Sequence, residues 1–307
     1  MSRYTFNPKL DPNRDRNRRL ALTALVVLAA FIHATWNLLA KRAADGGAAF
    51  VFAYTVVSCI AYAPWVAYEL TRGAMVWSWT VVGFLALSAA LHLFYSLALQ
   101  RGYQAADLSV VYPTARGSGP LMSSLGAFLL LGETPTALKF AGLAAVVAGI
   151  LLIATQGRLA NLSTPGGRAG LRWGLTTGAL IAAYSLSDAY SVKTLGVPPV
   201  VLDWFSSAGR ALMLWAMFAH RMGSARTAMA GKWRLAIWVG VLSPLSYIFV
   251  LSALTLGAPL SVVAPAREMS MMVGALMGMV ILREPVGPWR LAGCAVLIAG
   301  VVMLQRG

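Results

Sequence analysis

Hydrophobic residues occur along this chain in ten long runs that are separated by short polar breaks. In the first half the runs cover residues 20–40, 48–69, 77–100, 107–131 and 136–155, and in the second half 172–193, 199–219, 232–256, 260–282 and 287–305. A helix needs about 20 mostly apolar residues to cross a bilayer. The pattern therefore predicts an all-α integral membrane protein with about ten transmembrane helices.

The second half of the chain repeats the first. Residues 108–116, LSVVYPTAR, return as residues 260–267, LSVVAPAR, once Thr114 is deleted, and Glu133 corresponds to Glu284. Five helices per unit is an odd number, so the second unit must enter the membrane from the opposite side and form an inverted-topology repeat. The predicted organisation is a basic cytoplasmic tail (1–19), a first five-helix repeat (20–155), a linker (156–170) and a second five-helix repeat (171–305).

Composition excludes a water-soluble protein. Only 11% of the residues are charged and the mean hydropathy is +0.70, whereas soluble domains carry about 25% charged residues. The net charge of +15 lies at the ends of hydrophobic runs and in the tail, which indicates contact with a lipid bilayer and not with nucleic acid. The tail favours cytoplasmic N- and C-termini. The total number of lysines and arginines, with the tail included, is nearly equal on the two sides, at ten inside and twelve outside, and the basic residues at 221–234 favour the opposite orientation.

The first hydrophobic run could in principle belong to a cleaved signal peptide. It extends to Ala40, which is long enough to span a membrane, and it has a counterpart in the second repeat near residues 171–195. We therefore expect it to be a retained first helix.

Polar residues stand inside several predicted spans, where ionisable groups are costly and usually face a partner or a cavity. His33, Trp36 and Asn37 share one helix face through i, i+3 and i+4 spacing, and Tyr184, Ser187 and Asp188 repeat that spacing. Such faces predict a central cavity. The candidate substrate-binding residues are His33, Trp36, Asn37, His92, Tyr95, Tyr112, Arg116, Tyr184, Asp188 and Arg267; Arg210 also lies inside a span.

Arg116 and Arg267 each follow a proline, Pro113 or Pro265, within one helical turn. Proline disturbs a helix locally, and irregular backbone in a membrane must be buried in protein or line a cavity. One interpretation is that an arginine binds an anionic group such as a carboxylate. The other is a structural ion pair with Asp188 or Glu268, and it is stronger for Arg267 because Glu268 is adjacent.

Asp188 and Glu268 are also candidates for carrying a coupling proton, because burial favours the neutral form of a carboxyl group. A nearby arginine would oppose that effect. His33 and His92 are candidate proton relays, or histidines that simply hydrogen-bond between helices.

Several glycines and two glutamates are expected to have structural roles. Glycines seven residues apart on one helix face allow close helix approach, within one chain or, as the alternative, in a dimer; we expect a monomer. They are Gly142 and Gly149, with the counterparts Gly293 and Gly300, and residues 274–278 add a GxxxG motif. Glu133 and Glu284 precede proline-containing turns and are expected to cap the helices that follow them.

Two segments of the sequence, together with its division into two halves, resemble a known protein family. Residues 33–41 (HATWNLLAK), residues 107–117 (DLSVVYPTARG) and the two five-helix halves resemble the drug/metabolite transporter superfamily, and within it the EamA-like ten-helix family. The resemblance implies a multi-pass secondary transporter of the cell inner membrane. It also implies alternating access around a cavity built by the first four helices of each half, with the fifth and tenth helices at the periphery. The chain differs by its longer basic tail and by the charges inside its spans.

The resemblance and the buried arginines together predict export of small polar metabolites such as amino acids. Transport of phosphonates, phosphorylated metabolites or drugs is the alternative. A remote alternative is an integral-membrane enzyme that modifies lipids and uses His33, His92, Asp188 and Glu268. A further alternative is a membrane scaffold that transports nothing. The sequence contains no phosphate loop, HExxH or CxxCH motif, so we expect no enzyme activity, cofactor or metal.

Overall fold

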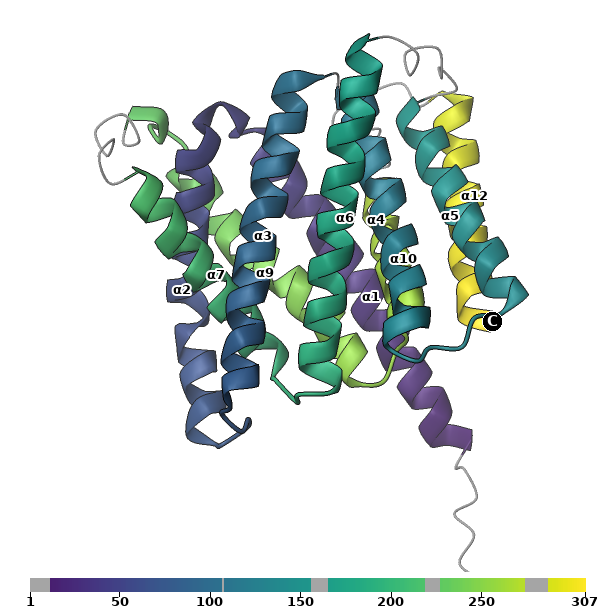
Figure 1. Ribbon diagram of the computed structural model, residues 1–307, viewed down its shortest axis with the longest axis horizontal. Coiled ribbons are helices and arrows are strands. Elements are labelled where there is room, and N and C mark those ends of the chain that lie inside the picture. The colour runs from purple at the N-terminus through teal and green to yellow at the C-terminus, as the bar shows by residue number, and fades with distance from the viewer. Residues whose placement is uncertain (1–11, 107, 156–164, 219–226, 274–286) are drawn as a thin grey trace, which may run out of the picture.

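A computed structural model describes residues 12–106, 108–155, 165–218, 227–273 and 287–307 (Figure 1). This part of the chain contains no strand. Its helices are α1 (Pro12–Lys41), η1 (Ala44–Gly46, a 3-10 helix), α2 (Gly47–Thr71), α3 (Trp79–Ala105), α4 (Leu108–Leu130), α5 (Ala137–Thr155), α6 (Pro165–Lys193), α7 (Pro199–Phe218), α9 (Trp233–Thr255), α10 (Leu260–Arg267) and α12 (Pro288–Arg306). The all-helical class predicted from the sequence is confirmed for these residues.

Several helices are suited to a membrane. Among the described residues, four stretches are long and apolar enough to cross one: Leu20–Ala40, Gly47–Thr71, Trp79–Leu99 and Trp233–Thr255. Large apolar side chains also face outward, including Ile60 at 69% exposure and Leu129 at 83%. Extensive exposed apolar surface marks a surface that meets another apolar phase. These features are typical of an integral membrane protein.

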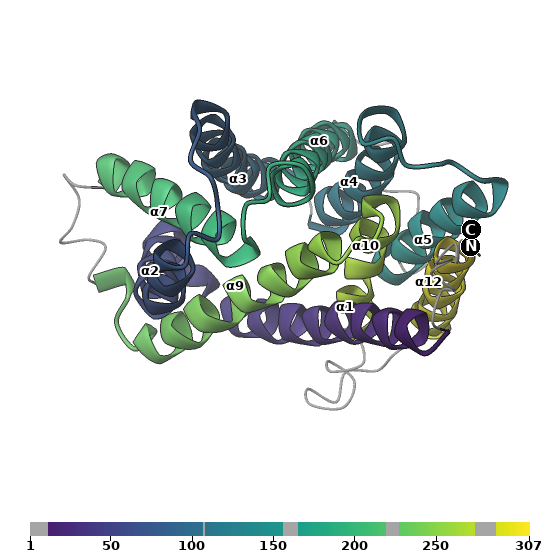
Figure 2. The same ribbon diagram turned by 90° about the horizontal axis from the view of Figure 1, so that it is seen from below.

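The helices of the two halves are interleaved. Seen from below, α3, α6 and α4 lie along one side of the molecule, and α9 and α1 lie along the other (Figure 2). The α2 and α7 helices pack together at one end, and α5 and α12 at the opposite end. Helices α1, α3 and α4 of the first half therefore lie beside α6, α9 and α10 of the second half, with the second helix and the last helix of each half at the two ends.

The α5–α12 contact depends on glycine. A Cβ atom on Gly149 would lie 2.8 Å from the Gly293 carbonyl oxygen, and one on Gly142 would lie 2.8 Å from that of Gly300. The two helix backbones therefore touch directly, as small residues allow in membranes. The predicted packing of these glycines within one chain is confirmed; the GxxxG motif at 274–278 lies outside the described residues.

The helices that contain Pro113 and Pro265 differ in whether they continue beyond the proline. The α4 helix is continuous from Leu108 to Leu130, so the disturbance expected at Pro113 does not interrupt it. Proline has no N–H, so Pro113 cannot donate the helical hydrogen bond to the Ser109 carbonyl. Ser109 lies in the first turn of α4, so only one turn of the helix precedes the missing bond. In contrast, α10 ends at Arg267, and Glu268 lies in a turn before the chain becomes helical again at 269–273. The turn tightens through i to i+3 hydrogen bonds on both sides of Glu268.

Glu133 caps a different helix from the one expected. Its Oε1 accepts a hydrogen bond from the Leu260 backbone N–H at 2.6 Å, and its Oε2 accepts one from the Ser261 N–H at 3.0 Å. The carboxylate thus caps α10 of the second half, where the N-cap residue Pro259 offers no side-chain acceptor. The following helix, α5, is capped by the Thr136 hydroxyl. The prediction for Glu133 is therefore wrong about the helix, and Glu284 lies outside the described residues.

Replacing Glu133 with alanine is expected to lower the free energy of unfolding by about 0.5–2 kcal/mol, the usual cost of a lost N-terminal cap. The effect is measured by denaturant unfolding in detergent. Glu69→Ala is the matched control, because among the described residues the Glu69 carboxylate accepts one hydrogen bond, from the exposed Trp65 side chain, and caps no helix. Equal effects of the two variants would contradict a capping role for Glu133.

Candidate functional site

A cluster of charged side chains lies where α1, α4 and α10 meet. Arg116 on α4 donates a hydrogen bond from Nη1 to Glu268 Oε1 at 3.2 Å, and the same nitrogen lies 3.1 Å from Oε2. Nη2 of Arg116 lies 3.1 Å from Nε2 of His33 on α1. Glu268 is 0% exposed and Arg116 is 8% exposed. The Arg116–Glu268 ion pair is therefore buried and joins the two halves of the chain.

Arg267 belongs to the same cluster but is poorly paired. Its Nε lies 3.6 Å from Glu268 Oε1, which is beyond hydrogen-bond distance, and its Nε and Nη2 have no hydrogen-bond partner among the described residues. The side chain is nevertheless buried, with 5% exposure. Glu268 thus forms ion pairs with both arginines, at 3.1 Å with Arg116 and at 3.6 Å with Arg267. The structural ion pair expected between Arg267 and the adjacent Glu268 is therefore present, although the hydrogen-bonded partner of Glu268 is Arg116.

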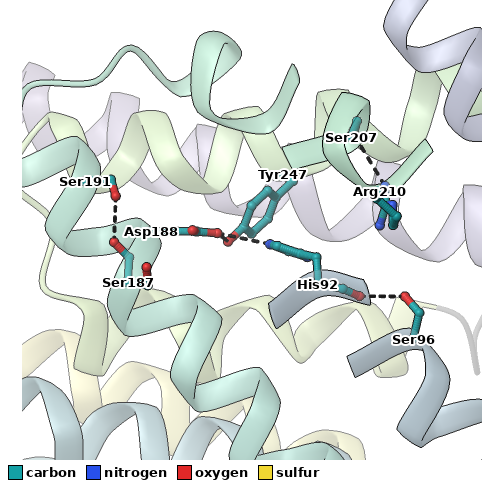
Figure 3. A network of polar contacts seen from close by, with 8 residues as sticks. All are labelled: His92, Ser96, Ser187, Asp188, Ser191, Ser207, Arg210 and Tyr247. Carbon is teal, nitrogen blue, oxygen red and sulfur yellow. Dashed lines mark hydrogen bonds and ion pairs between the residues drawn. The ribbon is translucent and has the colours of Figure 1, made fainter. Parts of the chain in front are cut away.

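A second polar cluster joins α3, α6 and α9 (Figure 3). Asp188 Oδ2 accepts a hydrogen bond from the Tyr247 hydroxyl at 2.6 Å and lies 3.1 Å from Nε2 of His92. Asp188 is 0% exposed, and its Oδ1 has no hydrogen-bond partner among the described residues. The carboxyl group therefore has one satisfied oxygen and one free oxygen.

Tyr184 connects the two clusters. Its ring stacks on His92 with the centroids 4.2 Å apart, and the Arg267 guanidinium carbon lies 5.9 Å from the Tyr184 ring centroid. Tyr95 meets the same ring edge-on at 5.6 Å. The free donors of Arg267 and the free oxygen of Asp188 are thus in neighbouring parts of one polar region.

The remaining predicted site residues are placed less centrally. Trp36 donates from Nε1 to the Ser246 hydroxyl at 3.3 Å, and Tyr112 lies beside Arg116 with its ring centroid 5.4 Å from the guanidinium carbon. The Asn37 amide donates to the His33 carbonyl of its own helix. Arg210 donates to Ser207 within α7, away from the Asp188 contacts (Figure 3).

The sequence analysis missed Tyr247 and Ser246, which supply the partners of Asp188 and Trp36. A signal for them exists, because Ser243, Ser246 and Tyr247 share the same i, i+3 and i+4 spacing that identified the other two helices. Each of α1, α6 and α9 therefore brings a polar face of the same type into the centre.

The chemistry of the region follows from its charges. Two buried arginines stand against one buried glutamate, so the first cluster has an excess positive charge. A guanidinium with free N–H groups is well suited to a carboxylate or phosphate. The free Asp188 oxygen is an acceptor for a proton or an ammonium group. Among the described residues no group of three or more His, Cys, Asp or Glu is arranged to hold a metal ion.

Comparison with known proteins identifies the fold alone. No protein-family model matches the sequence, and no curated protein matches it. A solved structure described as "Crystal structure of protein" superposes on this chain with a TM-score of 0.71 and 16% sequence identity, over 93% of this chain and 96% of that one. The architecture is therefore one that a protein of very different sequence also adopts. Fold and polar core together define an all-helical protein with apolar helices suited to a membrane and a buried, charged centre.

Proposed function

We propose that the protein is a secondary active transporter of the cell inner membrane, related to the EamA-like drug/metabolite transporters, which exports small amino-acid-like metabolites. The observation that carries the proposal is the buried Arg267 guanidinium, whose Nε and Nη2 have no hydrogen-bond partner among the described residues. A buried donor without a hydrogen-bond partner is costly. A substrate carboxylate that fits there removes that cost, so the site favours binding of such a group.

The pattern of helix contacts supports two inverted repeats. Exchanging the two halves maps α1 onto α6 and α9 onto α3. The α1 and α9 helices pack together, and so do the corresponding helices α6 and α3. The α2–α9 and α3–α7 pairs exchange in the same way, and the α5–α12 pair maps onto itself. Inverted repeats that share a central site are the basis of alternating access in many transporters. In this proposal the chain spans the membrane about ten times as a monomer, with both termini in the cytoplasm.

Asp188 favours a zwitterionic substrate over a phosphorylated one. Arginine alone recognises a carboxylate and a phosphate equally well. The free Oδ1 of Asp188 would repel a doubly charged phosphate and attract an ammonium group. An amino acid carries both of the required charges, whereas phosphonates and phosphorylated metabolites remain the second candidates.

Counterflow in proteoliposomes tests the proposal. Protein-loaded vesicles that contain unlabelled amino acids are expected to accumulate a labelled amino acid from a panel, and Arg267→Ala is expected to weaken binding by about 10- to 100-fold, because it removes a charge-assisted hydrogen bond. Arg210→Ala is the matched control, since Arg210 is also partly buried in a span but bonds to its own helix.

Absence of exchange for the whole panel, from folded protein, would overturn the amino-acid proposal. The same vesicles would then be tested with phosphorylated and phosphonate compounds. Exchange of those compounds that depends on Arg267 would support the second candidate.

A further inference from the structure

Glu133 joins the ends of four helices. Its backbone N–H donates to the Ala127 carbonyl of α4 at 3.3 Å, and its carboxylate accepts hydrogen bonds from the first two N–H groups of α10. Lys193 is the last residue of α6, and its Nζ lies 3.5 Å from Glu133 Oε1. The same Nζ donates to the carbonyl of Ala258, just beyond α9, at 3.3 Å. All of these contacts lie at the lower end of the molecule in Figure 1.

The four helices that meet at Glu133 carry most of the polar site. Their contributions are Arg116 on α4, Tyr184 and Asp188 on α6, Tyr247 on α9 and Arg267 at the end of α10. Among the described residues the Glu133 side chain bonds to none of these groups, so it acts on the site only through the helices. The cluster of contacts around Glu133 therefore fixes where the site-bearing helices stand relative to one another.

The α10 helix depends most on this cluster. It has only eight residues, Leu260–Arg267, and a helix this short is not stable alone. The Pro259 carbonyl is the partner of its third and fourth N–H groups, and the Glu133 carboxylate is the partner of the first and second. Leu260 and Ser261 are buried, so water does not replace a lost partner there. Arg267 lies about 10 Å further along the same short helix.

We propose that Glu133 is a positioning residue for substrate binding: it holds the start of α10 and thereby keeps the Arg267 guanidinium in place for the substrate carboxylate. The proposal rests on the proposed transport function. Lys193 extends the effect to α6, because it ties the end of that helix to Glu133. The separation between Arg267 and Asp188, the groups for the carboxylate and the ammonium group, is thus set from one point outside the site.

Hydrogen–deuterium exchange of the purified full-length protein in detergent tests the positioning without any substrate. In Glu133→Gln an NH2 group replaces one carboxylate oxygen and cannot accept a hydrogen bond, so one buried N–H of α10 loses its partner. Amide exchange is expected to become about 3- to 10-fold faster over the whole of residues 260–273, including the residues beside Arg267. Faster exchange confined to residues 260–263 would show that Glu133 is only a local cap and would overturn the proposal.

Thr136→Ala is the matched control. The Thr136 hydroxyl accepts a hydrogen bond from the Lys139 N–H and caps α5, a helix that carries none of the site residues. The control therefore removes a cap of the same kind, three residues from Glu133, without touching α10. It should leave the exchange of residues 260–273 unchanged. Equal acceleration in both variants would mean that any damage to this connection loosens α10, and the specific role of Glu133 would be refuted.

Counterflow in proteoliposomes with labelled alanine, leucine and threonine measures the consequence for binding. Glu133→Gln is expected to raise the half-saturation concentration about 3- to 10-fold and to leave the maximal exchange per folded molecule unchanged, because Arg267 itself is still present. Thr136→Ala should change neither quantity. A half-saturation concentration that is the same in Glu133→Gln and in the unaltered protein would contradict the positioning role.

Lys193→Met takes the place of Glu133→Gln if that variant does not fold. It keeps both hydrogen bonds of Glu133 to α10 but removes the link to α6, so a smaller shift in the same direction is expected, and no shift would overturn the proposal. If the unaltered protein exchanges none of the three amino acids, their transport is overturned. Deuterium exchange then still decides whether Glu133 holds α10 as far as Arg267.

Discussion

Replacing Gly149 with alanine is expected to lower the free energy of unfolding by about 1–3 kcal/mol, the usual cost of overpacking a tight interior. The added Cβ atom would lie 2.7 Å from the Leu297 backbone nitrogen and 2.8 Å from the Gly293 carbonyl oxygen. Both of these are backbone atoms, so no side chain can rotate away. The α5 and α12 helices would have to separate along their whole contact.

Denaturant unfolding in detergent, followed by tryptophan fluorescence, measures this effect. Gly83→Ala on α3 is the matched control, because a Cβ atom there meets nothing within 4 Å. Alanine also has the higher helix propensity, so this control should be neutral or slightly stabilising. Equal stability of the Gly149 and Gly83 variants would show that α5 and α12 do not approach as closely as described.

The helices were largely predictable from the sequence, because the length of a hydrophobic run is set by the thickness of the bilayer. The ends were less predictable. The residues before 172 were assigned to the linker because they are rich in glycine and proline, yet α6 begins at Pro165. Proline is well tolerated in the first turn of a helix, where its missing N–H has no partner to lose. A proline in the sequence can therefore lie either in a loop or in the first turn of a helix.

The partners inside the site were not predictable. Sequence adjacency linked Glu268 to Arg267, and this ion pair is present at 3.6 Å, but the hydrogen-bonded partner of Glu268 is Arg116 in the first half of the chain. Chain order linked Glu133 to α5, whereas its carboxylate caps α10 in the second half. These contacts depend on which helices cross in the centre, and a hydrophobic pattern does not contain that information. Tyr247 was missed for a related reason, because a tyrosine in an apolar span is ordinary until its hydroxyl is placed beside Asp188.

Replacing Glu268 with glutamine is expected to have the largest effect on stability. It would leave Arg116 and Arg267 buried together without a counter-ion in contact, and breaking a buried pair in this way costs about 3–5 kcal/mol. Glutamine has nearly the same shape, so packing is preserved and the loss reports charge alone. Denaturant unfolding in detergent measures the difference from the unaltered protein.

The double variant Arg116→Met with Glu268→Gln is the decisive control for this charge balance. The unaltered cluster has two arginines and one glutamate, and the double variant returns to the same excess of one positive charge. It should therefore be more stable than Glu268→Gln alone, because the uncompensated charge costs more than the lost pair. If Glu268→Gln itself has no effect, a group other than Glu268 must compensate the arginines. Asp188 is the remaining fully buried carboxylate in this region, and it would then no longer be free to bind an ammonium group.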